Sequence, residues 1–148
     1  MPNDDQKQIV VLIVEDEPLV RMFAGDVLKF DGDFRVVTAI NADEASNILY
    51  IRRDIKALIT NVNMPGSIDG LALAHVSRAQ RPDLAIIVTS GVDLTGPLPA
   101  EARFLAKPYA PIQLVGMVRE MLSLPAKPLE PPPSSHSDEA GIEGTPLG

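Results

Sequence analysis

The 148-residue chain contains no cysteine and no tryptophan, and its only aromatic residues are four phenylalanines and two tyrosines. The absence of cysteine excludes disulfides and thiolate metal sites. No apolar stretch reaches the roughly 18 residues that a membrane-spanning helix needs. Residues 1–5 are acidic and lack the apolar core of a signal peptide. We therefore expect a protein of the cytoplasm that has no contact with a membrane.

Positive charge is also scarce, because 13 lysines and arginines stand against 20 aspartates and glutamates, for a net charge of -7. Arg52 and Arg53 form an isolated pair rather than part of a basic stripe. Proteins that bind nucleic acids directly contact phosphates through a basic surface, and many stack bases on aromatic side chains. The composition therefore predicts no nucleic-acid partner.

What the chain does contain is a regular alternation of short β-branched runs with longer amphipathic segments. Hydrophobic residues make up 45% of the chain and charged residues 22%, which is typical of a globular domain. The pattern predicts strands at 9–14, 34–39, 57–61, 84–89 and 103–106, and helices at 18–30, from 42, at 70–81 and at 111–122. Strands separated by helices of this length predict an α/β fold, a doubly wound five-stranded parallel sheet covered on both faces.

Residues with a strong preference for helix starts lie at the beginning of three of these helices. Pro18 suits a first helical turn, and Asn41 and Asp69 are good N-caps. One segment does not fit the repeat, because 91–101 contains two glycines and two prolines. Since an interior proline costs a helix roughly 3 kcal/mol, we expect the fourth helix to be short or missing, with at most one turn near Ala100 in an otherwise flexible loop.

The composition changes again at the ends of the chain. Residues 1–8 are polar and are expected to be flexible. Six of the prolines, together with serines and glycines, fall in the last 24 residues. Such a composition cannot bury a core. We therefore expect one domain over residues 9–123 and a disordered, proline-rich tail over 124–148.

Four of the predicted strands end in polar residues of different kinds. Glu15-Asp16, Asn61, Thr89-Ser90 and Lys107-Pro108 follow successive apolar runs. The carboxyl ends of parallel strands meet at one edge of the sheet, so these side chains are expected to converge. Each of them alone is better explained as an ordinary surface residue. Together, two acids suit Mg²⁺, a hydroxyl of Thr89 or Ser90 suits a phosphoryl oxygen, and a lysine suits developing negative charge.

These residues, with the 64–70 loop of sequence MPGSIDG and the Lys107-Pro108-Tyr109 turn, make the chain similar to a known family. It resembles the receiver domain of bacterial response regulators, the phosphoacceptor module of two-component signalling, over residues 9–122. The resemblance implies a flavodoxin-like sheet of strand order 2-1-3-4-5. The Lys107-Pro108 dipeptide itself makes a cis peptide bond plausible, although only about 5–6% of X–Pro bonds in folded proteins are cis.

The resemblance assigns a role to each candidate. Metal binding falls to Glu15, Asp16, the side chain of Asn61 and the backbone carbonyl of Asn63. Lys107 would pair with the phosphoryl group, Thr89 would be the switch hydroxyl, and Phe104 the aromatic whose rotamer changes on activation. In that family an aspartate accepts the phosphoryl group from a histidine kinase or a phosphotransfer protein. The activated domain then signals by protein–protein contact with a downstream target.

Asn61 departs from the family, because it holds the position of the aspartate that accepts the phosphoryl group. An amide is a poor nucleophile and carries no charge. Losing one anion should weaken Mg²⁺ binding, since charge count sets much of the affinity for a hard cation. It should also reduce repulsion among the acids, so we expect the metal-free fold to be more stable with asparagine than with aspartate.

Two explanations of Asn61 are compatible with the sequence. The chain is a non-phosphorylatable variant of a single-domain response regulator, or it is a native pseudo-receiver that acts as a phosphate-independent adaptor. An adaptor would use the proline-rich tail or the helix at 18–30 with the loop before residue 111. A Mg²⁺-dependent phosphohydrolase is disfavoured, because the nucleophile is missing and neither His75 nor His136 is placed as a general base. We therefore expect no enzymatic activity.

Overall fold

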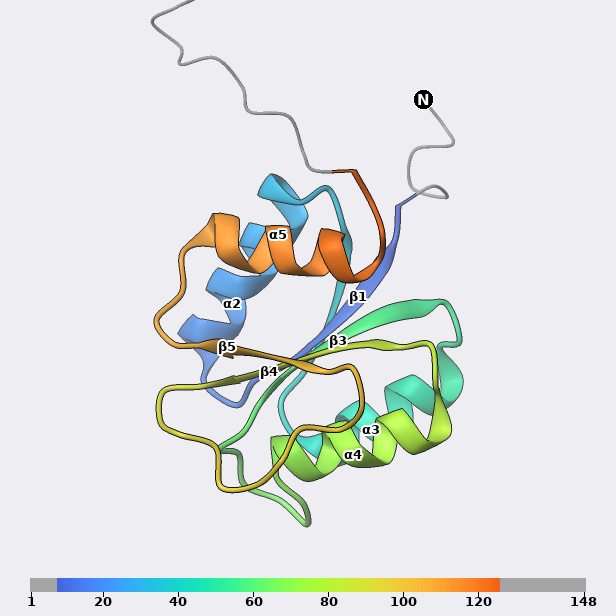
Figure 1. Cartoon of the computed structure of the whole chain (residues 1–148), viewed down its shortest axis with the longest axis vertical. Helices are drawn as coiled ribbons and strands as arrows, with labels where there is room; N and C mark the ends of the chain where they lie inside the picture. The colour runs from blue at the N-terminus through green and yellow to red at the C-terminus, as the bar shows by residue number, and fades with distance from the viewer. Residues whose placement is uncertain (1–7, 126–148) are drawn as a thin grey trace, which may run out of the picture.

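Five parallel strands form the centre of the computed structural model, which describes residues 8–125 (Figure 1). Their order is β2-β1-β3-β4-β5, as the resemblance implied. The elements along the chain are β1 (Val10–Val14), α2 (Pro18–Asp26), η1 (Val27–Asp31), β2 (Arg35–Ala39), α3 (Ala42–Ile51), β3 (Ile55–Asn61), α4 (Gly70–Gln80), β4 (Ala85–Ser90), β5 (Arg103–Ala106) and α5 (Pro111–Met121).

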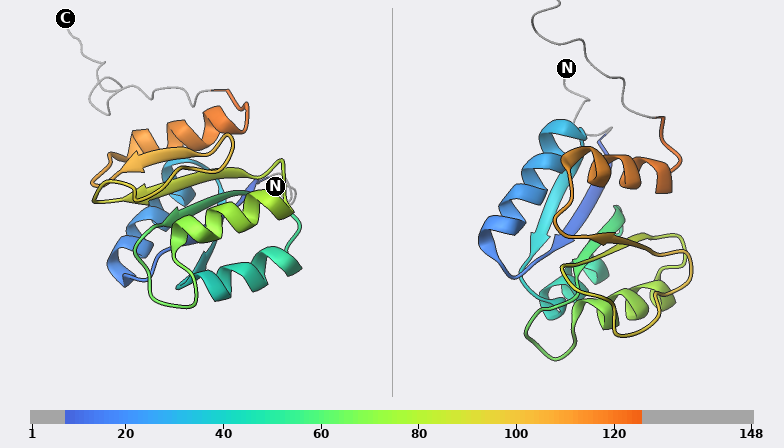
Figure 2. Two further views of the ribbon diagram at one scale, coloured as in Figure 1. Left: turned by 60° about the horizontal axis from the view of Figure 1, so that its bottom comes forward. Right: turned by 60° about the vertical axis from the view of Figure 1, so that its left-hand side comes forward.

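Helices cover both faces of the sheet, so the predicted doubly wound fold is confirmed. Figure 2 shows α2 and α5 on one face and α3 and α4 on the other. Successive strand residues point to opposite faces and therefore enter two separate cores. Leu12, Leu58 and Ile86 face α3 and α4. Ile13, Ile59 and Ile87 face α2, η1 and α5. Burial on both faces explains why the strands are apolar almost without interruption.

The predicted helix starts are confirmed by the capping contacts. The Asn41 side chain accepts a hydrogen bond from the Glu44 N–H at 2.8 Å, and the Glu44 carboxylate accepts one from the Ile40 N–H at 2.8 Å. Asp69 accepts one from the Ala72 N–H at 2.8 Å. Each cap satisfies an N–H that the helix itself leaves without a partner and contributes about 1 kcal/mol.

The first helix differs from the prediction of one α-helix over 18–30. It ends as α-helix at Asp26 and continues as the π-helical turn η1. Gly32 N–H then donates to the Val27 carbonyl, and Phe34 N–H to the Leu28 carbonyl. The wider turn brings Phe34 into the core, where it is almost fully buried. Hydrophobic spacing alone could not distinguish this turn from a regular α-helix, because a single wider turn of five residues shifts the apolar positions too little to change the pattern.

The segment 91–102, all of which the structure describes, contains no helix and has only a turn at Ala100 and Glu101, as predicted. It is nevertheless well anchored, in contrast to the expected flexible loop. Leu94 and Leu98 pack against the core that α4 also covers. His75 Nε2 donates to the Pro97 carbonyl, and Arg78 Nε donates to that of Ala100, both at 2.8 Å.

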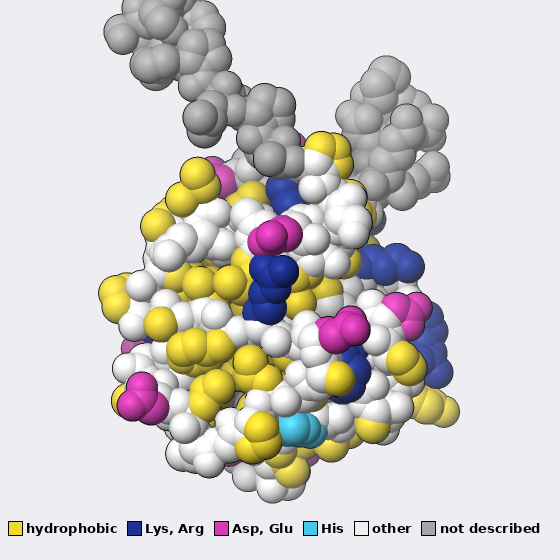
Figure 3. All heavy atoms as spheres, viewed as in Figure 1, with side chains coloured by type: hydrophobic (Ala, Val, Ile, Leu, Met, Phe, Trp, Pro, Cys, Tyr) yellow, Lys and Arg dark blue, Asp and Glu magenta, His cyan; other side chains and the backbone are white. Residues whose placement is uncertain are grey.

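This segment lies on the side of the molecule seen in Figure 3, next to β5, where hydrophobic side chains gather at the surface. Val92 is one of the exposed large apolar residues there. Over residues 8–125, no helix combines the length and apolar character needed to cross a bilayer. The expectations for residues 1–7 and 126–148, His136 included, lie outside the described residues.

Candidate functional site

The predicted convergence of strand ends is what the sheet geometry produces. Glu15 follows the last residue of β1, and Lys107 follows the last residue of β5. Asn61 ends β3 and lies opposite Thr89 of β4 in the parallel register. Because register partners place their side chains on the same face, Asn61 and Thr89 leave the sheet together. Four separate segments of sequence therefore supply one site.

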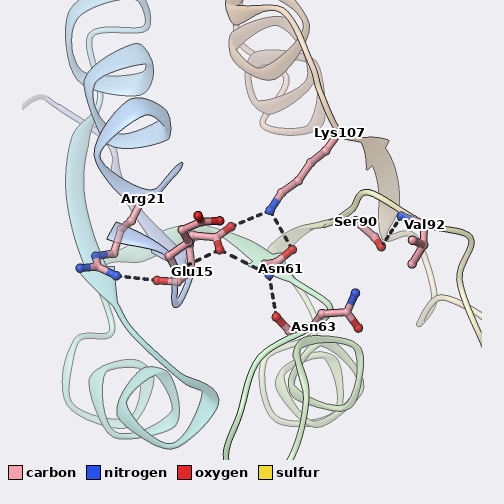
Figure 4. Close-up of polar contacts among 8 residues, drawn as sticks. Glu15, Arg21, Asn61, Asn63, Ser90, Val92 and Lys107 are labelled. Carbon is pink, nitrogen blue, oxygen red and sulfur yellow. Dashed lines mark hydrogen bonds and ion pairs between the residues drawn. The ribbon is translucent and has the colours of Figure 1, made fainter. Parts of the chain in front are cut away.

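Asn61 lies at the centre of this site (Figure 4). The Lys107 ammonium donates to Glu15 Oε1 at 2.8 Å and to Asn61 Oδ1 at 2.9 Å. The Asn61 amide nitrogen in turn donates to the backbone carbonyl of Asn63 at 2.9 Å and to Glu15 Oε2 at 3.4 Å. Lysine, carboxylate and amide thus form one closed set of hydrogen bonds.

The neighbours of the Asn61 amide determine which way it points. An ammonium group can only donate, so the amide oxygen must face Lys107. A backbone carbonyl can only accept, so the amide nitrogen must face Asn63. A flipped amide would set two donors against each other at Lys107 and two acceptors against each other at Asn63. The orientation is therefore dictated by chemistry at both ends.

Glu15 carries a charge in a nearly closed environment, since its side chain is only 5% exposed. The Lys107 side chain that pairs with it is 23% exposed. The Glu17 N–H adds a third hydrogen bond, to Glu15 Oε2 at 3.2 Å. A buried carboxylate is tolerated only when it is paired and hydrogen-bonded, and Glu15 meets both conditions.

Tyr109 borders the site from the turn that follows Lys107. Burial of its ring, with a smaller effect from the charge of Glu15, raises the pKa of Tyr109 to about 12. The Tyr109 ring also lies 6.3 Å from that of Phe23 on α2, measured between centroids. The peptide bond between Lys107 and Pro108 is cis, in agreement with the expectation from the sequence.

Two residues support the site without having been recognised from the sequence. Arg21 on α2 donates to the backbone carbonyl of Glu15 at 2.8 Å. Gly70, the first residue of α4, packs directly on the backbone of Asn61, and a Cβ atom there would collide with it. Gly70 N–H also donates to the Val62 carbonyl at 2.9 Å. Gly70 was noted only as part of a motif, and no sequence pattern marked Arg21.

The other predicted site residues stay outside the hydrogen-bonded cluster. Thr89 is buried, but within residues 8–125 its hydroxyl makes no hydrogen bond to the cluster. Ser90 uses its hydroxyl to accept from the Val92 N–H at 3.1 Å, which closes the turn after β4. Asp16 is exposed, and Phe104 is partly exposed on β5 opposite Val88.

The oxygen atoms that the resemblance assigns to Mg²⁺ do not fit a divalent cation as they are arranged here. Asn63 and Glu15 are among the residues that the resemblance assigns to Mg²⁺, and both already accept hydrogen bonds from the Asn61 amide. Asn61 Oδ1, a third oxygen of that set, accepts from Lys107, and the carboxylate of Asp16 is exposed to water. Among residues 8–125, no group of three or more acidic, histidine or cysteine side chains could hold a metal ion.

Comparison with known proteins agrees with this architecture. The family model described as the response regulator receiver domain matches residues 11–119. A solved receiver domain of the hybrid histidine kinase CckA is 32% identical, with a TM-score of 0.65 over 76% of this chain and 98% of that one. A response regulator receiver protein from Sinorhizobium medicae is 23% identical, with a TM-score of 0.73 over 80% of this chain and 97% of that one, and it supports the fold alone.

Curated relatives belong to signalling proteins of several sizes. The response regulator Rre1 of Synechocystis is 31% identical over 78% of this chain. The sensor kinase CckA of Brucella abortus is 36% identical over 76% of this chain. The matched region is 52% of the length of Rre1 and 12% of the length of CckA. The chain therefore spans about half, or much less, of the curated relatives it matches.

Proposed function

Because the chain belongs to the family of response regulator receiver domains, we propose that it works in two-component signalling as a protein-binding module and not as an enzyme. With the family's aspartate at position 61, the pocket would accept a phosphoryl group from a histidine kinase or a phosphotransfer protein. The observation that carries this proposal is the position of the Lys107 ammonium, 2.9 Å from Asn61 Oδ1. In the form described here, Asn61 blocks the transfer.

The chemistry of the pocket supports both halves of the proposal. A lysine beside the attacking oxygen would neutralise charge on the phosphoryl group during transfer, which is the main contribution that such sites make. Thr89, on the same face of the sheet as Asn61, could then donate its hydroxyl to the bound group. An amide oxygen is uncharged and weakly nucleophilic, so it cannot take the aspartate's part.

An apolar surface next to the pocket is suited to the protein partner. Leu19, Met22 and Phe23 on α2 are exposed by 73%, 57% and 46%, and Ile112 at the start of α5 by 69%. α2 begins directly after the loop of Glu15, and α5 directly after the turn of Lys107, so this surface flanks the site. We propose that a kinase or phosphotransfer protein of the cytoplasm docks here, and that a downstream protein receives the output.

A phosphate-independent adaptor is the second candidate function. It is favoured by one observation, the complete pairing of Glu15, Asn61 and Lys107 with one another. A pocket whose charged and polar groups already satisfy each other has little need of a phosphoryl group to become ordered. In this case the same α2 surface would bind its partner constitutively.

The two candidates differ in what happens when aspartate is restored. We would incubate this chain and Asn61→Asp with MgCl₂ and acetyl phosphate and record their intact masses. Asn47→Asp is the matched control, because it makes the same chemical change on an exposed side chain of α3, which contributes no residue to the site. The proposed receiver function predicts that only Asn61→Asp gains the mass of one phosphoryl group.

The outcomes separate the candidates clearly. If neither Asn61→Asp nor the chain with Asn61 is modified, the phosphoacceptor function is wrong and the adaptor function replaces it. If the control is modified as much as Asn61→Asp, the modification is unspecific and the assignment of position 61 is wrong.

A further inference from the structure

The Asn61 amide nitrogen holds together two segments that the receiver resemblance would join through a metal. One hydrogen bond reaches Glu15 in the loop after β1, and the other reaches the carbonyl of Asn63 in the loop after β3. We propose that the Asn61 carboxamide replaces the divalent cation as the link between these loops, so that the domain is assembled independently of Mg²⁺. The inference rests on the receiver assignment but not on phosphoryl transfer.

The geometry of the pocket opposes cation binding. A cation that used the Asn63 carbonyl and Glu15 would need Asn61 to present its oxygen to the same point. The amide would have to turn over, which breaks its bonds to Asn63 at 2.9 Å and to Glu15 at 3.4 Å. It would also point its N–H₂ group at the Lys107 ammonium, which now donates to Oδ1 at 2.9 Å. Binding the cation therefore requires the loss of three hydrogen bonds and the creation of a donor–donor contact.

The charges in the pocket oppose cation binding as well. Affinity for a hard cation rises with the number of anionic ligands. Glu15 is neutralised by Lys107 at 2.8 Å, and Asn61 is uncharged. Of the side chains assigned to the metal, Asp16 alone keeps an unpaired charge, and it is exposed to water, where a carboxylate attracts ions weakly. The pocket therefore offers a cation little in return for the hydrogen bonds that it would break.

The consequence is a receiver whose loops are already joined in the absence of metal. Val62 N–H donates to the Thr89 carbonyl at 2.9 Å, so the loop of Asn63 is also tied to β4. On the other side, Arg21 holds the carbonyl of Glu15 at 2.8 Å. The conformation of both loops, and hence of the adjoining α2 surface, should not respond to Mg²⁺ in the cellular range.

Thermal unfolding of the full chain tests the proposal directly. We would melt the chain with Asn61 and the variant Asn61→Asp in EDTA and in about 10 mM MgCl₂, with NaCl matched for ionic strength. We expect the Tm of the chain with Asn61 to change by less than about 1 °C. The aspartate variant should rise by about 5 °C, as expected when Mg²⁺ is present at about ten times its Kd. An equal rise in both proteins, or a rise in neither, would overturn the replacement of the cation by the amide.

The side-chain amide itself gives a second, local readout. In the ¹⁵N-labelled chain with Asn61, the side-chain N–H₂ signal of Asn61 is identified as the one that is lost in Asn61→Ala. We expect slow exchange with solvent and no shift of this signal when MgCl₂ is added. Exchange as fast as that of an exposed amide, or a shift on titration with Mg²⁺, would refute the proposal. Neither readout depends on whether Asn61→Asp accepts phosphate, so a failure of the proposed function can be distinguished from a failure of this inference.

Discussion

Replacing Asn61 by aspartate should destabilise the metal-free domain, although aspartate is the residue found in the family. The substitution removes the amide nitrogen that donates to the Asn63 carbonyl and to Glu15. It also brings a second carboxylate beside Glu15, in a site where both residues are buried. In the chain with Asn61, the amide nitrogen donates to both acceptors. In the variant, a carboxylate oxygen without a hydrogen faces the same two acceptors.

The size of the effect follows from the contacts. At an effective dielectric of about 20, repulsion between the two carboxylates at 3.4 Å is about 5 kcal/mol, and attraction to Lys107 at 2.9 Å is about 6 kcal/mol, so the charge terms nearly cancel. The two lost hydrogen bonds cost about 1 kcal/mol each, and the unpaired Asn63 carbonyl adds about 1 kcal/mol. The net loss is therefore about 2–3 kcal/mol, or about 10 °C in Tm for a domain of this size.

Circular dichroism melts of the two proteins in EDTA measure this difference. Asn47→Asp serves as the control for added charge, and because its side chain is exposed we expect it to stay within about 0.5 kcal/mol of the chain with Asn61. An aspartate variant that melts at the same temperature as the chain with Asn61, or above it, would show that the Asn61 hydrogen bonds do not stabilise the metal-free domain.

Three further predictions concern the surroundings of the site. Gly70→Ala should lower stability by about 3 kcal/mol in urea unfolding, because its Cβ collides with the backbone of Asn61; an unchanged midpoint would contradict this contact. Arg78→Ala should speed hydrogen exchange in residues 96–102, since Arg78 bonds the Ala100 carbonyl; unaltered exchange would mean that the segment is held by other contacts. In a Tyr50→Phe background, absorbance should show Tyr109 ionising near pH 12. Its raised pKa contributes stability that is complete below its ordinary value of 10.0 and is lost as the pH rises towards 12, and ionisation near 10 would disprove the burial effect.

Much of the fold was predictable, because its main signals are local. N-caps such as Asn41 and Asp69, the strand ends and the prolines of segment 91–101 each act on the backbone next to them. Their effects can therefore be predicted without knowing which residues lie nearby in the fold. The sheet order came from the resemblance to receiver domains and was confirmed. The anchoring of segment 91–101 was not predicted, because it depends on His75 and Arg78 of α4, which each bond a residue 22 positions further along the chain.

The candidate site was predictable in membership but not in its bonding. The sequence brought Glu15, Asn61 and Lys107 to one edge of the sheet, and the structure joins them. The direction of the Asn61 amide depends on a donor in the loop after β5 and an acceptor in the loop after β3, so no spacing rule could reveal it. Arg21 was missed for a different reason, since it donates to the backbone carbonyl of Glu15, and any residue type has such a carbonyl.

Asn61 alone is expected to block a pocket otherwise suited to a phosphoryl group. Fluorine NMR with beryllofluoride, a stable mimic of that group, tests it on the site itself. In MgCl₂, Asn61→Asp should show resonances of bound beryllofluoride, whereas the chain with Asn61 should show only those of the free species. A bound signal from the chain with Asn61, or none from the aspartate variant, would contradict a block by Asn61 alone.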